Sequence, residues 1–336
     1  MTLEELQKVV LGFNMPKFTA GQIAEWIYRH RVTEIDMMVN ISKRNKELLE
    51  SRYCIGREKP IYTTVSVDGT EKYLFAFSSG QGIETVYIPD KDRATLCVSS
   101  QAGCRMNCRF CVTGRHGFHG QLTCHDIMNQ ILSAPHSDKL TNIVFMGMGE
   151  PLDNIHSVIQ SIDILTSKWG LAWSPRRITV SSVGKLDNLP LLLDKTDVHV
   201  AISLHTSFSD ERSLLMPVEK SFPLEKVIKM LSRYDFTRQR RCSFEYIMWK
   251  DLNDDEAHAD DLIKLLHAIP GCRVNLIRFH AFDEEPELKP VSLKKMEEFR
   301  DYLNAHGITA TIRASRGEDI MAACGMLAGK GSLNIE

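Results

Sequence analysis

The spacing of apolar positions divides the chain into three regions. In residues 1–55, apolar side chains recur at intervals of three and four, as at Ile23, Trp26 and Ile27, which is the spacing of one helix face. Residues 60–89 instead alternate polar and apolar positions, and Asp68-Gly69 and the glycine-rich residues 79–82 interrupt the alternation. Such a pattern predicts short strands joined by hairpin turns, over 62–67, 72–77 and 84–88.

From residue 93 onward, short apolar runs alternate with amphipathic stretches. The runs predict strands at 94–99, 142–147, 177–182, 198–204, 242–248, 273–279 and 308–313, and the stretches between them predict helices at 155–168, 224–234, 257–268 and 293–305. Repeated strand–helix units indicate a parallel sheet with right-handed crossovers. Six or seven units are too few to close an eight-stranded barrel. We therefore predict an α/β fold with an incomplete (β/α)6-type barrel, whose chemistry lies where strands end and loops begin.

These patterns give three predicted domains: a helical accessory domain over 1–55, a β-hairpin connector over 56–92, and the partial barrel over 93–336. The chain begins without a basic segment followed by an apolar run, and no stretch reaches the roughly 20 apolar residues of a membrane span. We therefore expect a cytoplasmic protein without a membrane partner.

The formal net charge of −2 neither favours nor excludes a nucleic-acid partner, because RNA binding needs only a local basic surface. Three local clusters exist, each of which is also typical of a solvated helix face or turn. They are Lys43, Arg44 and Lys46; Arg176 and Arg177; and Arg238, Arg240 and Arg241.

Nine cysteines are many for such a chain, and an odd number without a secretion signal argues against a disulfide framework. Three of them, Cys104, Cys108 and Cys111, have the spacing C-x3-C-x2-C directly after the first predicted barrel strand. Three thiolates can hold three irons of a [4Fe–4S] cubane and leave the fourth open for catalysis. Phe110 is an apolar neighbour that could shield such a cluster.

A structural zinc loop is the alternative interpretation of this motif. Zinc would need a fourth ligand, and His116, His119 and Cys124 are near enough in sequence to supply it. The chain would then be a non-catalytic, zinc-stabilised RNA-binding protein.

The cysteine motif resembles that of the radical S-adenosylmethionine (SAM) superfamily. The segment Met146-Gly-Met-Gly-Glu-Pro151, after the second predicted strand, is similar to the superfamily's GGEP-like segment. The resemblance implies that the open iron chelates SAM, that one-electron reduction yields a 5′-deoxyadenosyl radical, and that Gly149 and Glu150 bind SAM.

Further segments resemble the bacterial rRNA adenine C2-methyltransferase family over essentially the whole chain. They are Thr95–Cys104, Glu84–Pro89, Ser203-Leu-His205 and Arg316–Gly325. The resemblance implies that Cys324 is methylated by one SAM, loses a hydrogen atom to the radical from a second SAM, and joins C2 of the adenine. It further implies that Cys97 resolves this adduct through a transient disulfide with Cys324. Glu84 would be the proton acceptor, and Met146 would lie near the cluster.

The same resemblance carries over further SAM-binding positions: Ser181, Ser203, Leu204 and His205. One segment departs from the family, because residues 275–280 read Asn-Leu-Ile-Arg-Phe-His where the family has a final Asn and Arg278 replaces a proline. His280 is the matching position and can still donate and accept hydrogen bonds.

Taken without the resemblance, Cys324 would be a small packing residue, Cys97 a core cysteine, Glu84 a solvated strand residue and His205 a core histidine. The remaining cysteines, Cys54, Cys124, Cys242 and Cys272, match no motif and are expected to be structural.

The implied substrate is an adenine of 23S rRNA, and in some family members also the adenine beside the tRNA anticodon. An electron donor such as flavodoxin or ferredoxin and a monomeric state are expected. A C8-methylating relative shares the cluster and both auxiliary cysteines, although Pro151 and the helical N-terminus favour C2. A radical SAM enzyme with a non-RNA substrate, such as a glycyl-radical activase, would have no need of Cys324.

Overall fold

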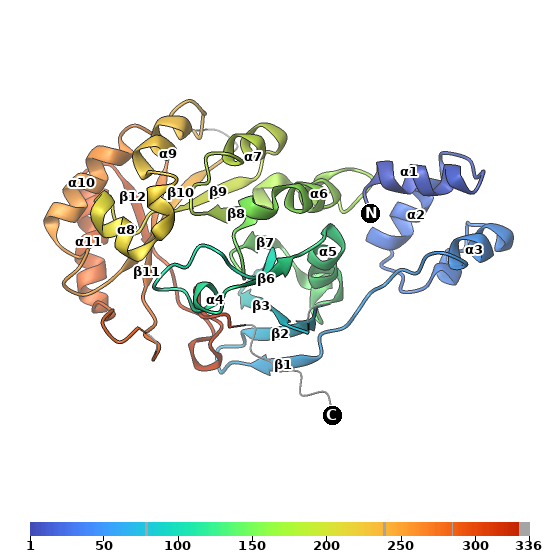
Figure 1. Ribbon diagram of the computed structural model, residues 1–336, viewed down its shortest axis with the longest axis horizontal. Helices are drawn as coiled ribbons and strands as arrows, with labels where there is room; N and C mark the ends of the chain where they lie inside the picture. Colours follow the sequence, from blue (N-terminus) through green and yellow to red (C-terminus); the bar gives the residue numbers. More distant parts are fainter. Residues whose placement is uncertain (78–79, 238–239, 284, 329–336) are drawn as a thin grey trace.

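A computed structural model describes residues 1–77, 80–237, 240–283 and 285–328. Ser79 of the second predicted turn and Arg238 of the third basic cluster lie outside these residues. In the described chain a ten-stranded sheet runs in the order β1-β2-β3-β4-β7-β8-β9-β10-β11-β12, with β1 and β12 at its edges (Figure 1).

Seven neighbouring strands of the described sheet are parallel, so the predicted partial barrel is confirmed. They are β4 (Arg93–Cys97), β7 (Asn142–Phe145), β8 (Ile178–Ser182), β9 (His199–Ser203), β10 (Cys242–Met248), β11 (Arg273–Arg278) and β12 (Thr309–Ile312). Helices connect them and cover the outer face of the sheet (Figure 1). They are α5 (Cys124–Ser133), α6 (Ile155–Thr166), α7 (Leu189–Lys195), α9 (Leu224–Leu231), α10 (Glu256–Leu266) and α11 (Leu293–Ala305).

The predicted hairpin segment forms three antiparallel strands, β1 (Tyr62–Val65), β2 (Glu71–Ala76) and β3 (Gly82–Asp90). It is not a free-standing connector, because β3 pairs antiparallel with β4 and places Val86 opposite Cys97. The hairpin therefore extends the barrel sheet on the side of its first parallel strand.

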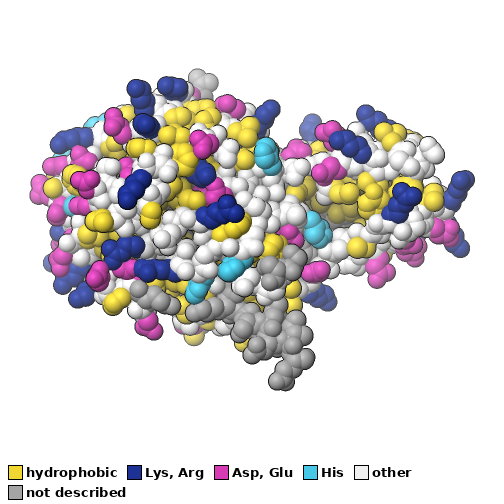
Figure 2. Space-filling model, in the orientation of Figure 1, with side chains coloured by type: hydrophobic (Ala, Val, Ile, Leu, Met, Phe, Trp, Pro, Cys, Tyr) yellow, Lys and Arg dark blue, Asp and Glu magenta, His cyan; other side chains and the backbone are white. Residues whose placement is uncertain are grey.

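The N-terminal region folds into the predicted helices, α1 (Leu3–Gly12), α2 (Thr19–Tyr28) and α3 (Lys43–Glu50). Ser42 caps α3, since its hydroxyl accepts the Asn45 N–H at 3.3 Å. The helices form the right-hand lobe in Figure 1, and Figure 2 shows apolar side chains gathered on that lobe. Arg29 joins it to the barrel by donating to the Gly170 carbonyl at 3.2 Å.

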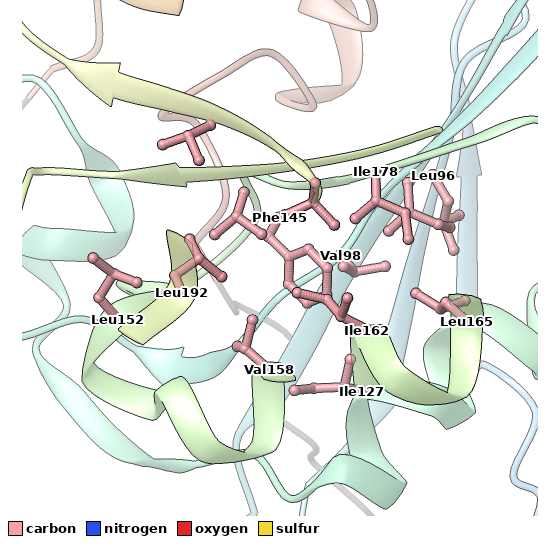
Figure 3. Close-up of a cluster of buried hydrophobic side chains, with 14 of the residues drawn as sticks. Leu96, Val98, Ile127, Phe145, Leu152, Val158, Ile162, Leu165, Ile178 and Leu192 are labelled. Carbon is pink, nitrogen blue, oxygen red and sulfur yellow. The ribbon is translucent and has the colours of Figure 1, made fainter. Parts of the chain in front are cut away.

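Side chains along the parallel strands alternate between two environments, as the two-residue period of a strand requires. Leu96, Phe145 and Ile178 point outward and pack against Val158 and Ile162 of α6 (Figure 3). The intervening positions face the barrel interior and are mostly polar: Thr95, Asn142, Thr179, Ser243 and Asn275. Closed barrels fill this space with branched apolar side chains, so the polar positions here leave the interior open.

Among the described residues, no helix is both long and apolar enough to cross a bilayer.

Candidate active site

The three-cysteine motif lies on a loop whose base is closed by a short sheet that the sequence did not predict. β5 (Gln101–Gly103) pairs antiparallel with β6 (Phe118–Gln121), and the Cys104 N–H donates to the Gly117 carbonyl at 2.8 Å. Gly103 has a φ of +77°, and a Cβ there would lie 2.0 Å from the Gly117 oxygen. Only glycine allows this close approach. The strands are too short to give a recognisable alternation.

Cys104, Cys108 and Cys111 line one cavity of about 150 Å³ near the C-terminal ends of the parallel strands. Burial raises the pKa of the Cys104 thiol to about 12 and also raises the pKa values of the other two. Buried thiols of this kind become ligands when a metal replaces their protons. Within the described residues no His, Cys, Asp and Glu side chains converge on a site for a single ion. Three thiols around a shared volume fit a cluster with three protein ligands.

The residues considered as a fourth zinc ligand are not among the described lining of this cavity. The imidazole Nε2 of His119 lies 3.0 Å from the His116 carbonyl. Cys124 begins α5, where its sulfur accepts the Ser161 hydroxyl at 3.5 Å. None of the three candidate fourth zinc ligands therefore lines the described cavity.

Five of the seven predicted SAM-binding residues line the same cavity as the cysteines: Gly149, Glu150, Ser181, Ser203 and His205. They come from the loops that follow β7, β8 and β9 or from the last residues of these strands. The parallel register brings these C-terminal ends to one edge of the sheet. The cavity thus combines three thiols with a polar wall suited to an amino-acid group.

Gly149 is held where only glycine fits. Its φ is +96°, and a Cβ would stand 2.5 Å from the Cβ of Gln101. The Gln101 side-chain oxygen accepts the Glu150 N–H at 2.8 Å, which ties the loop after β7 to β5.

Replacing Gly149 with alanine is therefore expected to displace this wall and weaken SAM binding about tenfold or more, since backbone strain of this kind costs about 1–3 kcal/mol. Equilibrium dialysis of labelled SAM against the anaerobically reconstituted protein measures the change. Gly12→Ala is the matched control, because Gly12 has open space around it. Equal SAM affinity in the Gly149 and Gly12 variants would contradict the prediction.

Glu150 bridges two strand ends inside the cavity. Its carboxylate accepts the Leu152 N–H and the Val183 N–H, each at 3.0 Å. Burial raises the pKa of Glu150 to about 7, although these hydrogen bonds oppose the shift. A cationic amino group in the cavity would favour the ionised carboxylate.

His205 and Leu204 diverge although they are adjacent. His205 has a φ of +62°, and its Nδ1 accepts the Ile247 N–H at 3.0 Å. Burial lowers the pKa of His205 to about 3, so the imidazole is neutral. Its ring packs edge-to-face with the Phe110 ring, and the two ring centroids lie 4.6 Å apart. The Leu204 side chain is fully buried in the main core. Leu204 is thus absent from the described cavity lining.

A buried arginine that the sequence analysis missed supports this wall from behind. Arg212 on α8 (Ser209–Leu215) donates to the carbonyls of Ser203 at 2.8 Å, Val183 at 3.1 Å and Leu204 at 3.2 Å. Its guanidinium also forms a fully buried ion pair with Glu219. It lies in a charged run that is typical of a solvated helix face, so no sequence signal distinguishes it.

Arg212→Ala is expected to lower the free energy of unfolding by about 3–5 kcal/mol, because it leaves Glu219 buried without its partner. Urea denaturation followed by circular dichroism measures the loss. Arg300→Ala, which removes a half-buried arginine paired with the exposed Asp301, should leave the midpoint almost unchanged. The double variant R212M/E219L should recover much of the loss. An unchanged midpoint in Arg212→Ala would show that the pair does not stabilise this wall.

A second, larger cavity of about 540 Å³ occupies the barrel interior. Inward positions of β4, β10 and β11 line it, including Cys97 at the end of β4. It opens to solvent at the N-terminal ends of the strands, where its lining includes the exposed side chains of Arg93, Arg176, Arg241 and Arg273.

Cys324 lies where the two cavities meet. The cavities share six lining residues: Met146, Glu245, Ile277, Arg313, Cys324 and Leu327. Cys324 is the cysteine among these six residues, and its side chain is exposed. The sequence could place Cys324 only in a flexible loop, whereas the fold puts it between both volumes.

The loop that carries Cys324 is held on its C-terminal side by the helix after the cysteine motif, α4 (Val112–Arg115). The Val112 N–H donates to the Gly325 carbonyl at 2.8 Å, and the Thr113 hydroxyl donates to the Leu327 carbonyl at 2.5 Å.

The turn between β1 and β2 holds the other side of the loop. Asp319 accepts the Ser66 hydroxyl at 2.5 Å and the Val67 N–H at 3.1 Å. Asp68 accepts the Gly317 N–H at 3.0 Å. Cys324 is therefore presented by a loop anchored at both ends.

Two predicted site residues face this loop rather than the smaller cavity. Glu84 is buried on β3, pairs with Lys72 at 3.1 Å and accepts the Ala328 N–H at 2.7 Å. It is absent from the described lining of both cavities. His280 lines only the larger cavity, and its Nε2 lies 2.9 Å from the Ser315 hydroxyl. The path of the loop after β12 brings Ser315 to His280 and so turns this imidazole away from the smaller cavity.

The electrostatic surroundings of Cys97 are mixed. Burial, followed by the charge of a Cys324 thiolate, raises the pKa of Cys97 to about 12, while Arg313 partly opposes this shift. Arg313 donates to the sulfur of Met146 at 3.4 Å and to Glu245 at 3.2 Å. At neutral pH Cys97 is therefore a protonated thiol beside a fixed cation.

Two family models match the chain. One describes the radical SAM superfamily and covers residues 98–263, and the other describes the N-terminal domain of ribosomal RNA large subunit methyltransferases and covers residues 1–55.

Several relatives match at full length. The chain is 54% identical to the probable dual-specificity RNA methyltransferase RlmN of Phocaeicola vulgatus, over 97% of this chain and 93% of that one. It is 41% identical to the dual-specificity RNA methyltransferase RlmN of Syntrophotalea carbinolica, over 98% and 88%. Among solved structures, a radical SAM methyltransferase from Sphaerobacter thermophilus matches with a TM-score of 0.91 and 36% identity, over 98% of each chain.

Proposed function

The chain belongs to the RlmN family of radical SAM RNA methyltransferases, and on this premise we propose that it methylates C2 of an adenine through Cys324 as methyl carrier. The proposed substrates are 23S rRNA and the adenine next to a tRNA anticodon. The observation that supports the proposal best is the position of Cys324, which lines the cavity of the three cysteines and also the larger cavity. A carrier thiol needs access to a methyl donor on one side and to a base on the other.

The smaller cavity fits the cofactors of this family. Cys104, Cys108 and Cys111 would hold the [4Fe–4S] cluster, and the wall from Gly149 to His205 would hold SAM. When bound, the reduced cluster supplies the electron that converts SAM into a 5′-deoxyadenosyl radical. We propose that a second SAM is consumed as methyl donor, so that each turnover uses two.

In the proposed reaction, Cys324 accepts the methyl group on its sulfur. Transfer of one hydrogen atom from this S-methyl group to the 5′-deoxyadenosyl radical leaves a carbon radical that bonds to C2 of the adenine. The adduct then loses the C2 proton and one electron, and the oxidised cluster would take up that electron. C2 is electron-poor and its hydrogen is not acidic. C2 therefore cannot act as the nucleophile that takes a methyl group directly from the sulfonium of SAM. The Cys97 thiolate then attacks the sulfur of Cys324 and breaks its bond to the methylene carbon. This carbon takes up a proton and becomes the methyl group of the base, and the Cys97–Cys324 disulfide is left for two-electron reduction by an external reductant.

Glu84 is the proposed acceptor of the C2 proton. Its carboxylate is bound by the Ala328 N–H and Lys72. The Ala328 contact ties this carboxylate to the segment that follows Cys324, so we propose that proton acceptance is coupled to movement of the carrier loop.

The larger cavity has the size expected for a small-molecule or nucleoside site, and an adenine must leave its stack to enter it. We propose that the helical region 1–55 contacts the RNA outside this cavity, and that a flavodoxin- or ferredoxin-type donor reduces the cluster. SAM contact by His280 is not part of this proposal, because His280 lines only the larger cavity.

The test is the intact mass of the anaerobically reconstituted protein after incubation with SAM carrying a labelled methyl group. One labelled methyl per chain, mapped to Cys324 by peptide mass spectrometry, supports the carrier role. An unlabelled chain that still cleaves SAM would overturn it. Chromatography of nucleosides from treated rRNA and tRNA against C2- and C8-methyladenosine standards then decides the position, and C8 product would identify the resistance-type activity instead.

A further inference from the structure

The N-terminal ends of the parallel strands carry a ring of arginines around the mouth of the larger cavity. Arg93 begins β4, Arg176 precedes β8, Arg241 precedes β10 and Arg273 begins β11. All four are exposed and line the cavity. They come from sequence positions up to 180 residues apart (273 − 93), so only the parallel sheet brings them together.

None of these four guanidinium groups has a carboxylate partner within the described chain. The two acidic side chains of the cavity are already engaged, Asp90 with Arg316 at 3.3 Å and Glu245 with Arg313 at 3.2 Å. The face shown in Figure 2 differs, because basic and acidic side chains are interspersed there.

The positive charge of the arginine ring acts on His199, the first residue of β9. After burial, the positive charges of Arg241 and Arg176 are the largest causes that lower the pKa of this imidazole. His199 is therefore neutral at pH 7 and does not add to the ring. Mutually repelling, unpaired arginines of this kind are stabilised when an anion binds between them.

The ring leads inward to the reactive thiols. Below Arg93, the same face of β4 presents Thr95 and then Cys97, so one strand runs from the mouth to the proposed resolving thiol. The other end of the barrel is occupied by the cysteine loop and the smaller cavity. The arginine end therefore offers a route to Cys97 and Cys324 that does not pass through the smaller cavity.

We propose that RNA docks on this arginine ring, with its phosphates on the guanidinium groups and the target adenine inserted along the barrel axis toward Cys324. This inference rests on the proposed function and adds the side of approach and the contact residues. A polyanion is favoured over a single phosphate, because β4 to β11 spans five strand pairings, on the order of 20 Å along the sheet. One phosphate cannot contact arginines spread over that length, whereas an RNA strand can.

The experiment compares Arg176→Gln and Arg241→Gln, singly and combined, with Arg177→Gln as matched control. Arg177 is the immediate neighbour of Arg176, but it packs on the Trp173 ring at 5.7 Å and is absent from the described cavity lining. RNA affinity is measured by filter binding with an rRNA fragment at several salt concentrations, on the reconstituted full-length protein. Labelling of Cys324 by methyl-labelled SAM is recorded for each preparation.

Each cavity-lining substitution should weaken RNA binding roughly tenfold and lower the slope of log affinity against log salt by about 1. Arg177→Gln should bind as wild type does, and Arg241→Lys should keep most of the salt-dependent affinity because the charge is retained.

Wild-type affinity and salt slope in the double variant would overturn the docking proposal. Loss of Cys324 labelling in the ring variants would also overturn it, because the ring would then support the SAM cavity rather than RNA. Failure of the proposed function can be told apart from failure of the docking proposal. In that case the wild-type protein itself would carry no label on Cys324, whatever the RNA affinity of the arginine variants.

Discussion

Replacing Cys324 with alanine is expected to abolish methylation of RNA, by more than about a thousandfold, and to leave the protein unlabelled by methyl-labelled SAM. Within the described residues, Cys324 is the thiol that lines both cavities. Cys97 lines only the larger one, so it cannot take over contact with the methyl donor. Scintillation counting of RNA and intact mass of the protein measure the two losses.

Cys54→Ala is the matched control, because Cys54 is the other exposed cysteine of the described chain and lies in the segment after α3. It should label and turn over like wild type. RNA methylation that survived in Cys324→Ala would show that the methyl group reaches the adenine by another route.

Replacing Cys97 with alanine is expected to arrest the enzyme after one turnover as a covalent RNA–protein complex. Without a second thiol in the larger cavity, the bond between Cys324 and the base has no nucleophile to resolve it. A shifted band that survives denaturing electrophoresis and disappears after ribonuclease treatment measures the complex. Multiple turnover should fall at least about a hundredfold.

The pH dependence of the rate at which the wild-type enzyme resolves the covalent RNA–protein complex provides an independent check. The pKa of Cys97 is about 12, so its thiolate fraction rises about tenfold for each pH unit between pH 7 and 9. The rate at which the complex disappears should rise in that direction. Cys54→Ala again serves as control, and normal multiple turnover in Cys97→Ala would contradict the assigned role.

The sequence by itself determined the strands of the parallel sheet, four of its helices and the cysteine loop. β10 (Cys242–Met248) and α11 (Leu293–Ala305) have the bounds predicted from an apolar run and an amphipathic stretch. The three cysteines fall in one short loop, so covalent spacing alone brings them to one cavity. The polar inward positions of β4 and β10 follow from strand alternation in the same way. The roles of Glu84, Cys97 and Cys324 came from family resemblance, since no local pattern distinguishes them.

Only the tertiary structure decided which side chains face which cavity. Leu204 and His205 are neighbours, yet a left-handed backbone at His205 sends one into the core and the other into the site. Glu84 reaches Ala328, and Arg176 and Arg241 line one cavity, only because distant parts of the chain come together. The direction of a loop side chain depends on partners that approach only when the sheet has assembled. Periodicity and spacing describe neighbours along the chain, and they carry no information about such partners.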